Sequence, residues 1–389
     1  MSALTAAAQP GWTRLAGRVV RRLGYGNAYS LGVYLATRAA VALGVITAYL
    51  LRPTWSWHRI VTREDAWWYQ YIAGHGYGHQ LRLHLVSDRF HSRFSTWAFY
   101  PGYPLTIRAL HIVTRMPYSI SGFVLSLVFA AVAVRAVYGL GNAVGGQVVA
   151  RGSAALLAAW PGSAAMNLPY SEGLFVAAAA GSLTALLQRR WLLAGVLGAV
   201  ATGTRAIGVA VLAAAIVAAV QEIAARRTWQ ALAAPVVAAV GVGAFYLYGW
   251  QQTGDPLVWR HAESLWHQHL DFGAGVIHRL RHDFPHRGGH AVTALLLAVG
   301  LVMLTTMVVS AVALRRVMRP ALVAYAAVAA ALVVGYSDVG PRPRMILAII
   351  PGFVWVAQWL PPRLVEVLTV GLASALALPA FLYLTAVVP

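Results

Sequence analysis

Residues 31–51 read LGVYLATRAAVALGVITAYLL, and this run decides the class of fold. An apolar helix of about 20 residues crosses the hydrocarbon core of a bilayer, and similar runs recur from Ser30 to the C-terminus. Charged residues make up only 11% of the 389 residues, against about 25% in a soluble domain. The sequence therefore predicts an all-α polytopic membrane protein, in which residues 30–389 form a single transmembrane domain.

Charge and cysteine content exclude two other kinds of protein. The formal net charge is +19, and a strongly basic chain raises the question of nucleic-acid binding. The arginines are dispersed between apolar runs and form no patch on a soluble face, so nucleic acid is not expected as a partner. The chain has no cysteine, which excludes disulfides and thiol chemistry.

The N-terminal leader, residues 1–29, orients the chain. Several arginines lie between Arg14 and Arg22, before any long apolar run. This pattern differs from a cleavable signal peptide, and the positive-inside rule places the leader in the cytoplasm of a cell with this chain in its inner (plasma) membrane. The stretch from Trp12 to Leu23 is either a basic amphipathic helix on the cytoplasmic surface or a plain positively charged flank.

About eleven spans follow from the apolar runs and the charge rule. Two long polar segments, 52–118 and 251–290, are expected as large extracytoplasmic loops. The run from Leu192 to Gln221 is expected as two short helices broken at 203–208, where glycines flank Arg205. The remaining spans are expected at 31–51, 120–140, 147–163, 231–250, 291–313, 321–336, 345–360 and 364–386, together with a fourth span that ends at Gln188-Arg189-Arg190. A tight turn at Gly141–Gly146 is expected between the second and third spans.

The acidic residues are concentrated on one predicted side of the membrane. Only Glu222 and Glu366 fall in predicted inner segments. The acids on the outer side are Glu64, Asp65, Asp88, Glu172, Asp255, Glu263, Asp271, Asp283 and Asp338. Such an asymmetry favours an active site at the outer surface over a transport path with ionisable groups spread through the membrane.

The stretch REDAWWYQYIAGHGYGHQ, residues 63–80, places two adjacent acids beside the first span. Burial at the membrane interface would make either one a candidate base, whereas pairing with Arg63 would make it an ordinary loop acid. Adjacent acids do not share a helix face, so one of the two is expected to point into a site. The surrounding tryptophans and tyrosines are either an interfacial aromatic belt or a platform for sugar rings.

Further candidate residues lie elsewhere on the outer side. Glu172 begins a span, where an acid complements a helix N-terminus or contacts substrate hydroxyls. Arg205, Arg342 and Arg344 either bind a lipid phosphate or pair internally with Glu172 or Asp338. In the loop 253–268, one face of an amphipathic helix would carry Trp259, Glu263 and Trp266 or His267. The histidine pairs at four-residue spacing lack a companion ligand set, so no metal site is expected.

A series of motifs, in order, resembles the PIG-V family of mannosyltransferases, which belong to the GT-C class of membrane glycosyltransferases. The resemblance covers about residues 30–355. It rests on Asp65 before Trp68-Tyr69, on 72–77 (IAGHGY), 98–104 (AFYPGYP), 169–175 (PYSEGLF), 204–208 (TRAIG), 254–256 (GDP) and 343–345 (PRM). Two positions depart from the family pattern: Glu64 stands where a tryptophan is frequent, and Met345 where a tyrosine is usual.

The resemblance implies a GT-C type bundle and an inverting transfer of mannose from polyprenyl-phosphate-mannose at the extracytoplasmic face. It makes Asp65 the catalytic base, and Arg205 and Arg344 the groups that stabilise the leaving phosphate. Its acceptor would be a glycolipid or glycan, with no cofactor and with metal dependence left open. The expected substrate-binding residues are Glu64, Trp68, Tyr69, Tyr100, Tyr170, Glu172, Arg205, Trp266, His267, Arg342 and Arg344.

Two alternatives remain at this point. A transporter or flippase for a lipid-linked or polar solute would carry ionisable residues in mid-span and paired halves, and neither is evident in the sequence. A binder of lipid-linked sugar that has lost activity is the other alternative, because Glu64 departs from the family pattern.

Overall fold

The computed structural model describes residues 24–51, 60–79, 95–266, 268–282, 289–336 and 340–378. The predicted amphipathic helix at Trp12–Leu23, the side chains of His267 and Asp338, and the end of the last predicted span lie outside these ranges. Within them every regular element is helical, apart from an isolated antiparallel bridge between Leu270 and Tyr336. The prediction of an all-α protein is confirmed.

The helices follow one another along the chain with short connections. The first half comprises α2 (Tyr25–Leu51), α4 (Asp65–His75), η1 (Thr96–Ala98), α5 (Gly102–Thr114), α6 (Tyr118–Ala159), η2 (Pro161–Asn167), α7 (Glu172–Leu187), α8 (Trp191–Thr202), η3 (Ala206–Gly208) and α9 (Val209–Arg226). The second half comprises η4 (Trp229–Leu232), α10 (Ala233–Thr253), α11 (Val258–Leu265), α12 (Ala274–His282), α13 (Gly289–Leu314), α14 (Pro320–Gly335), α15 (Pro343–Ile346), α16 (Ile350–Trp359) and α17 (Pro362–Ala375).

Several of these helices are long and apolar enough to cross a membrane. Among the described residues five single helices meet that test, and the bent pair η2–α7 makes a sixth. Shorter apolar helices such as α8 and α14 lie beside them. A multi-pass membrane protein is therefore the class of this fold, and the total of about eleven spans stays a prediction.

The predicted helix breaks lie where the glycines are. Helix α6 bends at Gly145 and Gly146, and Gly146 has a φ of 74°, a conformation that glycine adopts without a steric penalty. The break between α8 and α9 covers residues 203–208, as the sequence predicted. It brings the backbone of Arg205 close to the start of α5, where the amide of Gly102 donates a 2.8 Å hydrogen bond to the carbonyl of Gly203.

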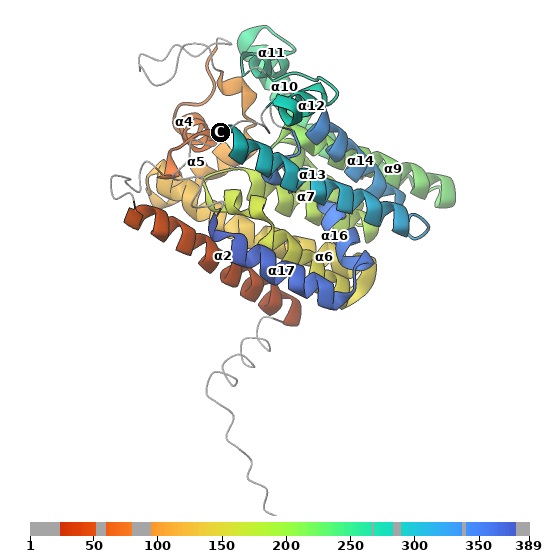
Figure 1. Cartoon of the computed structure of the whole chain (residues 1–389). Coiled ribbons are helices and arrows are strands. Elements are labelled where there is room, and N and C mark those ends of the chain that lie inside the picture. The colour runs from red at the N-terminus through yellow and green to blue at the C-terminus, as the bar shows by residue number, and fades with distance from the viewer. Residues whose placement is uncertain are drawn as a thin grey trace, which may run out of the picture.

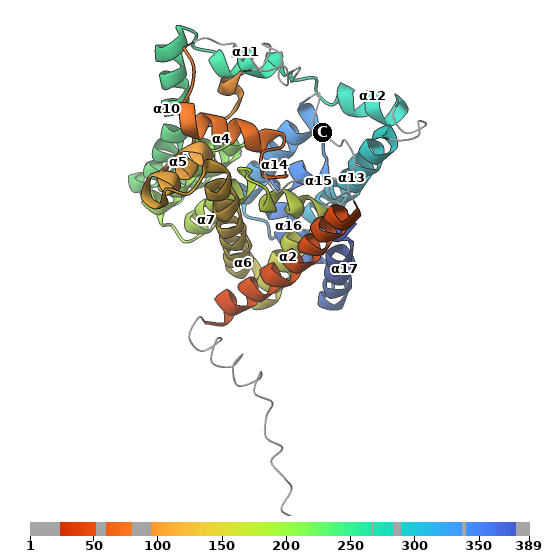
Figure 2. The same ribbon diagram turned by 90° about the vertical axis from the view of Figure 1, so that its left-hand side faces the viewer.

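The short helices α4, α11 and α12 lie toward one end of the bundle. In both ribbon views α11 and α12 lie at the top, α4 lies below α11, and α2 lies lower still, on the side of α4 away from α11 (Figures 1 and 2). The core runs through α6, α7, α14 and α16 and is rich in alanine. Small residues let helix backbones approach closely inside a membrane, and Gly173 lies directly against the backbone of α6 at Ala130. This packing fixes the N-terminus of α7 against α6.

Candidate active site

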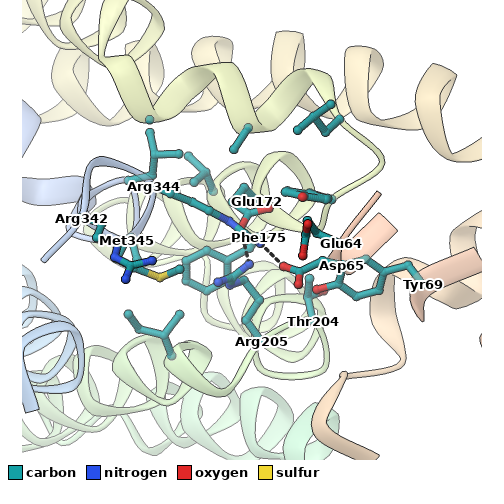
Figure 3. A pocket seen from close by; sticks show the side chains of 18 of the residues that line it. Glu64, Asp65, Tyr69, Glu172, Phe175, Thr204, Arg205, Arg342, Arg344 and Met345 are labelled. Atoms are coloured by element: carbon teal, nitrogen blue, oxygen red, sulfur yellow. Dashed lines mark hydrogen bonds and ion pairs between the residues drawn. The ribbon is translucent and has the colours of Figure 1, made fainter. Parts of the chain in front are cut away.

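A cavity of about 970 Å³ opens among α2, α4, α7, α11 and α15. It is lined by almost the whole set of predicted site residues that the structure describes. These are Glu64, Asp65, Tyr69, Tyr100, Tyr170, Glu172, Arg205, Trp266, Arg342 and Arg344. Residues from the first large loop, the start of α7, the α8–α9 break and the segment before α16 thus meet in one place, as Figure 3 shows for part of the set.

Glu172 is the centre of an ion-pair network in this cavity. Its Oε1 accepts a 2.6 Å hydrogen bond from Nη1 of Arg205 and another of 2.6 Å from Nε of Arg344. The side chain of Glu172 is only 4% exposed, and its Oε2 is buried without a hydrogen-bond partner among the described residues. A buried carboxylate is tolerated where cations compensate it. The predicted internal pairing of arginine with Glu172 is therefore confirmed.

Asp65 joins the same network through Arg344. Nη2 of Arg344 donates to Oδ2 of Asp65, while Nε of the same guanidinium holds Glu172 (Figure 3). Burial favours the neutral form of Arg344, but Asp65 and Glu172 outweigh that effect and raise its pKa above the ordinary value. A planar guanidinium that bridges two carboxylates in this way fixes their relative position.

The two adjacent acids have different partners. Asp65 is the first residue of α4, where a carboxylate is favoured by the helix dipole. Glu64 precedes the helix with a φ of 51°, which is uncommon for a residue with a side chain. Its carboxylate is 46% exposed and lies 3.2 Å from Nε of Arg63. Of the two acids, Asp65 alone bonds to the buried network, although both line the cavity.

The backbone that carries Arg344 is clamped by its neighbours. The indole N–H of Trp160 donates a 2.6 Å hydrogen bond to the carbonyl of Pro343. Gly162 packs so closely that a β-carbon there would overlap the same carbonyl. The guanidinium itself lies over the ring of Tyr170, 4.3 Å from its centroid, in a cation–π contact. Arg344 is thus positioned before any ligand arrives.

A second hydrogen-bond chain supports Arg205. Its Nη1 donates to Oγ of Ser171 over 3.1 Å, and the hydroxyls of Ser171 and Tyr69 lie 2.7 Å apart. Burial raises the pKa of Tyr69, so that its phenol stays neutral and orients the hydroxyl of Ser171. Within the described residues only Nη1 of Arg205 forms hydrogen bonds, which leaves its other N–H groups available to an anion.

One predicted residue lies behind the cavity wall. Trp68 is 2% exposed and does not line the cavity. Its ring stacks on Phe99 at 5.7 Å and meets Trp266 edge to face at 5.3 Å. It therefore supports Trp266, which does line the cavity. The interfacial-belt interpretation does not apply to Trp97 and Tyr103 either, because both are completely buried.

Arg38 also lines the cavity, although it was not among the predicted site residues. Arg38 lies in the middle of α2 and is 9% exposed. Its guanidinium donates to the carbonyls of Ala158 and Ser163 and to the side chain of Asn167, at 2.8 to 2.9 Å. An arginine inside an otherwise apolar run was the available signal. These bonds tie α2 to the end of α6 and to η2.

The wall beside Arg38 is apolar. It is formed by residues of α2, α6 and α7, namely Val41, Val45, Ile46, Phe123, Leu127 and Val176. The charged network and this wall belong to one cavity, which suits a molecule with an anionic head and a hydrocarbon tail. Among the described residues no group of three or more His, Asp or Glu side chains is placed to hold a metal ion.

Comparisons with known proteins find similarity in structure only. The chain matches no protein-family model and no curated protein. A crystal structure of ArnT from Cupriavidus metallidurans bound to undecaprenyl phosphate is similar over 92% of this chain and 62% of that one, with 15% identity and a TM-score of 0.49.

Two crystal structures of the Archaeoglobus fulgidus oligosaccharyltransferase are also similar, each with a TM-score of 0.46. One is tethered to an acceptor peptide, with 12% identity over 90% of this chain and 54% of that one. The other is a complex with zinc and sulfate, with 15% identity over 89% and 52%. The chain therefore spans between about half and three fifths of the length of these proteins. Similarity at this level carries no conclusion about activity.

Proposed function

We propose that this chain is a GT-C type membrane glycosyltransferase that moves mannose from a polyprenyl-phosphate donor to a glycolipid or glycan acceptor. One observation carries the proposal. Asp65, the expected base, shares a cavity with Arg205 and Arg344, and the same cavity has an apolar wall. A base, a cationic phosphate site and a place for a lipid chain are the three parts that transfer from a lipid phosphate requires.

In this proposal the reaction is a single displacement at C1 of the donor sugar. Among the described residues only Oδ2 of Asp65 is hydrogen-bonded, so Oδ1 is the atom that takes the proton from the acceptor hydroxyl. The acceptor oxygen forms a bond to C1 as the bond between C1 and the phosphate oxygen breaks. The electron pair of that bond leaves with the polyprenyl phosphate, and the configuration at C1 inverts.

Arg205 is the best candidate to receive the leaving phosphate. Its Nη1 is held by Glu172 and Ser171, while the rest of the guanidinium is open to a bidentate contact with phosphate oxygens. Arg344 bridges Asp65 and Glu172. Its main role is to position both carboxylates and to keep a positive charge beside them. Cationic groups fixed before the reaction stabilise developing charge without reorganisation.

The proposal includes a membrane position, which rests on the distribution of charge along the sequence. The chain lies in the plasma membrane with its leader in the cytoplasm and the cavity at the extracytoplasmic face, where the acidic residues concentrate. The polyprenyl tail lies against Val41, Val45 and Leu127, and the acceptor approaches from the side of the short helices.

Transfer is tested with the purified full chain in phospholipid nanodiscs. The chain is incubated with radiolabelled polyprenyl-phosphate-mannose and a lipid extract of its native host. A labelled product that is absent without the protein supports the proposal. Absence of product while the donor still binds contradicts transferase activity and favours a binder, and donor crossing the bilayer of proteoliposomes unchanged would indicate a flippase.

A further inference from the structure

The cavity has a second, aromatic end that the proposed chemistry does not use. Here residues of α10 and α11, together with residues that follow η1, α11 and α14, line the cavity. They are Tyr100, Tyr246, Trp259, Glu263, Trp266 and Tyr336, and we call this group the aromatic subsite. Aromatic rings that surround a few polar groups are typical of a small-molecule site.

The polar groups of the aromatic subsite include an unused donor. The indole Nε1 of Trp259 is buried and has no hydrogen-bond partner among the described residues. Buried N–H groups are nearly always paired, so one that lines a cavity points to a ligand acceptor. The ring of Trp259 meets Tyr100 nearly edge to face at 6.0 Å, which fixes its orientation.

Glu263 supplies the second polar group. Burial raises the pKa of Glu263 to about 8, and the charge of Asp65 adds to this effect while Arg205 opposes it. A carboxyl group that keeps its proton near neutral pH both donates and accepts hydrogen bonds. The subsite therefore offers hydrogen bonds and ring faces without a net charge, a combination that matches a neutral polyol.

The helix that carries Trp259 and Glu263 is held in place. Val258 and Ala262 of α11 are buried against Trp97 and Phe245. Gly249 of α10 lies so close to Val258 that a β-carbon would come within 2.5 Å of it. The amide of Asp271 donates a 2.8 Å hydrogen bond to the carbonyl of Gly335 and ties the following loop to α14. The aromatic subsite is thus preformed, which lowers the entropic cost of binding.

The position of the aromatic subsite distinguishes its ligand from the lipid. Helix α11 lies on the opposite side of α4 from α2 in both ribbon views (Figures 1 and 2). The apolar wall belongs to α2, α6 and α7, whereas Asp65 is at the start of α4. A lipid chain on the apolar wall and a sugar in the aromatic subsite would therefore approach Asp65 from different sides.

We propose that the aromatic subsite binds a neutral sugar ring, held by stacking and by hydrogen bonds to Trp259 and Glu263. The identification of this sugar as the acceptor rests on the proposed function, while the binding of a neutral sugar does not. An anionic sugar is disfavoured, because Asp65 acts electrostatically on Glu263 and would repel a second negative charge at the same place.

Binding is measured first, with methyl α-D-mannopyranoside as the neutral probe and methyl glucuronide as its anionic counterpart. Saturation-transfer NMR on the full chain in nanodiscs compares wild type with Trp259→Phe, which keeps a ring but lacks the N–H, and with Glu263→Leu, which lacks both oxygens. Matched controls are Trp250→Phe on exposed α10 surface and Glu366→Leu on exposed α17 surface.

Wild type and both controls should bind the neutral glycoside more tightly than the glucuronide. Each subsite variant should bind the neutral glycoside about tenfold more weakly, as expected for the loss of one buried hydrogen bond. Absence of binding to wild type, binding by both subsite variants as tight as that by wild type, or tighter binding of the glucuronide would each overturn the subsite.

A transfer assay distinguishes failure of this inference from failure of the proposed function. With octyl mannoside as acceptor probe, the subsite variants should raise the KM for the glycoside about tenfold and leave the KM for polyprenyl-phosphate-mannose unchanged. If wild type binds the glycoside but transfers nothing, the proposed function fails and the sugar site stands. If the variants transfer normally with an unchanged KM, the acceptor subsite fails and the proposed function stands.

Discussion

Nε of Arg344 donates a 2.6 Å hydrogen bond to Oε1 of Glu172, although the two residues are 172 positions apart in the chain. The contact joins the segment before α16 to the start of α7 and places Arg344 beside Asp65. Stability and chemistry are therefore linked at this pair, because the same guanidinium holds a structural carboxylate and the candidate base.

Glu172→Gln should lower the stability of the folded chain by about 3 kcal/mol, as expected when one partner of a buried ion pair is removed. The variant leaves two guanidinium groups without their common carboxylate. Thermal unfolding in a fixed detergent measures the effect. Glu366→Gln, on exposed surface of α17, is the control and should unfold as wild type does. Equal midpoints for the two variants would show that the network does not contribute to stability.

Arg344→Lys should reduce transfer about hundredfold, the usual effect of losing one preorganised group in an active site. An ammonium group cannot bridge Asp65 and Glu172 with the geometry of a guanidinium, nor stack equally over Tyr170. Turnover is measured with saturating donor. Arg189→Lys, in the more exposed pair with Glu222 at 3.1 Å, should retain turnover. Normal turnover by Arg344→Lys would show that the guanidinium of Arg344 is not required for transfer.

Gly162→Ala tests whether the backbone clamp positions Arg344. A β-carbon at Gly162 would overlap the carbonyl of Pro343, whereas at Gly243 it would meet nothing within 4 Å. Gly162→Ala should cost about 2 kcal/mol of stability through overpacking and should also lower transfer, while Gly243→Ala should leave transfer unchanged. If both alanine variants transfer normally, the clamp does not govern the site.

The sequence was informative about the helices and less so about the site. Apolar runs and glycines predicted a turn at 141–146, where α6 bends at Gly145 and Gly146, and the break at 203–208, because both are local properties of the chain. The network was foreseen only as an alternative, since Asp65 and Arg344 are 279 positions apart and no local pattern joins them. The spacing of aromatic residues in the sequence also did not distinguish Trp97, which is completely buried, from Trp259, which lines the cavity. Burial of an aromatic ring depends on tertiary packing, which the sequence does not display.

The stability of the chain should depend on pH through Glu263. Its pKa is raised from 4.5 to about 8 in the folded protein, first by burial and then by Asp65. The folded state thus holds a proton that the unfolded state releases, and stability should fall as pH rises from 4.5 to about 8 and change no further through this group above that. Groups that share its electrostatic environment are Asp65, Tyr100, Arg205, Tyr246 and Tyr336.

The unfolding midpoint of wild type minus that of Glu263→Gln isolates this contribution, because the amide does not titrate. The difference should decrease across the same pH range. A difference that is independent of pH would show that Glu263 is ionised in the folded state at neutral pH.

The most direct test of the central claim is a single-turnover transfer from radiolabelled polyprenyl-phosphate-mannose by wild type and Asp65→Asn, with Glu366→Gln as control. Asparagine keeps the size of the side chain and a hydrogen-bonding group near Arg344, but it cannot take a proton. We expect Asp65→Asn to bind the donor and unfold within a few degrees of wild type, yet to form no labelled product above background. Product formation by Asp65→Asn at a rate near that of wild type would contradict the assignment of Asp65 as the base.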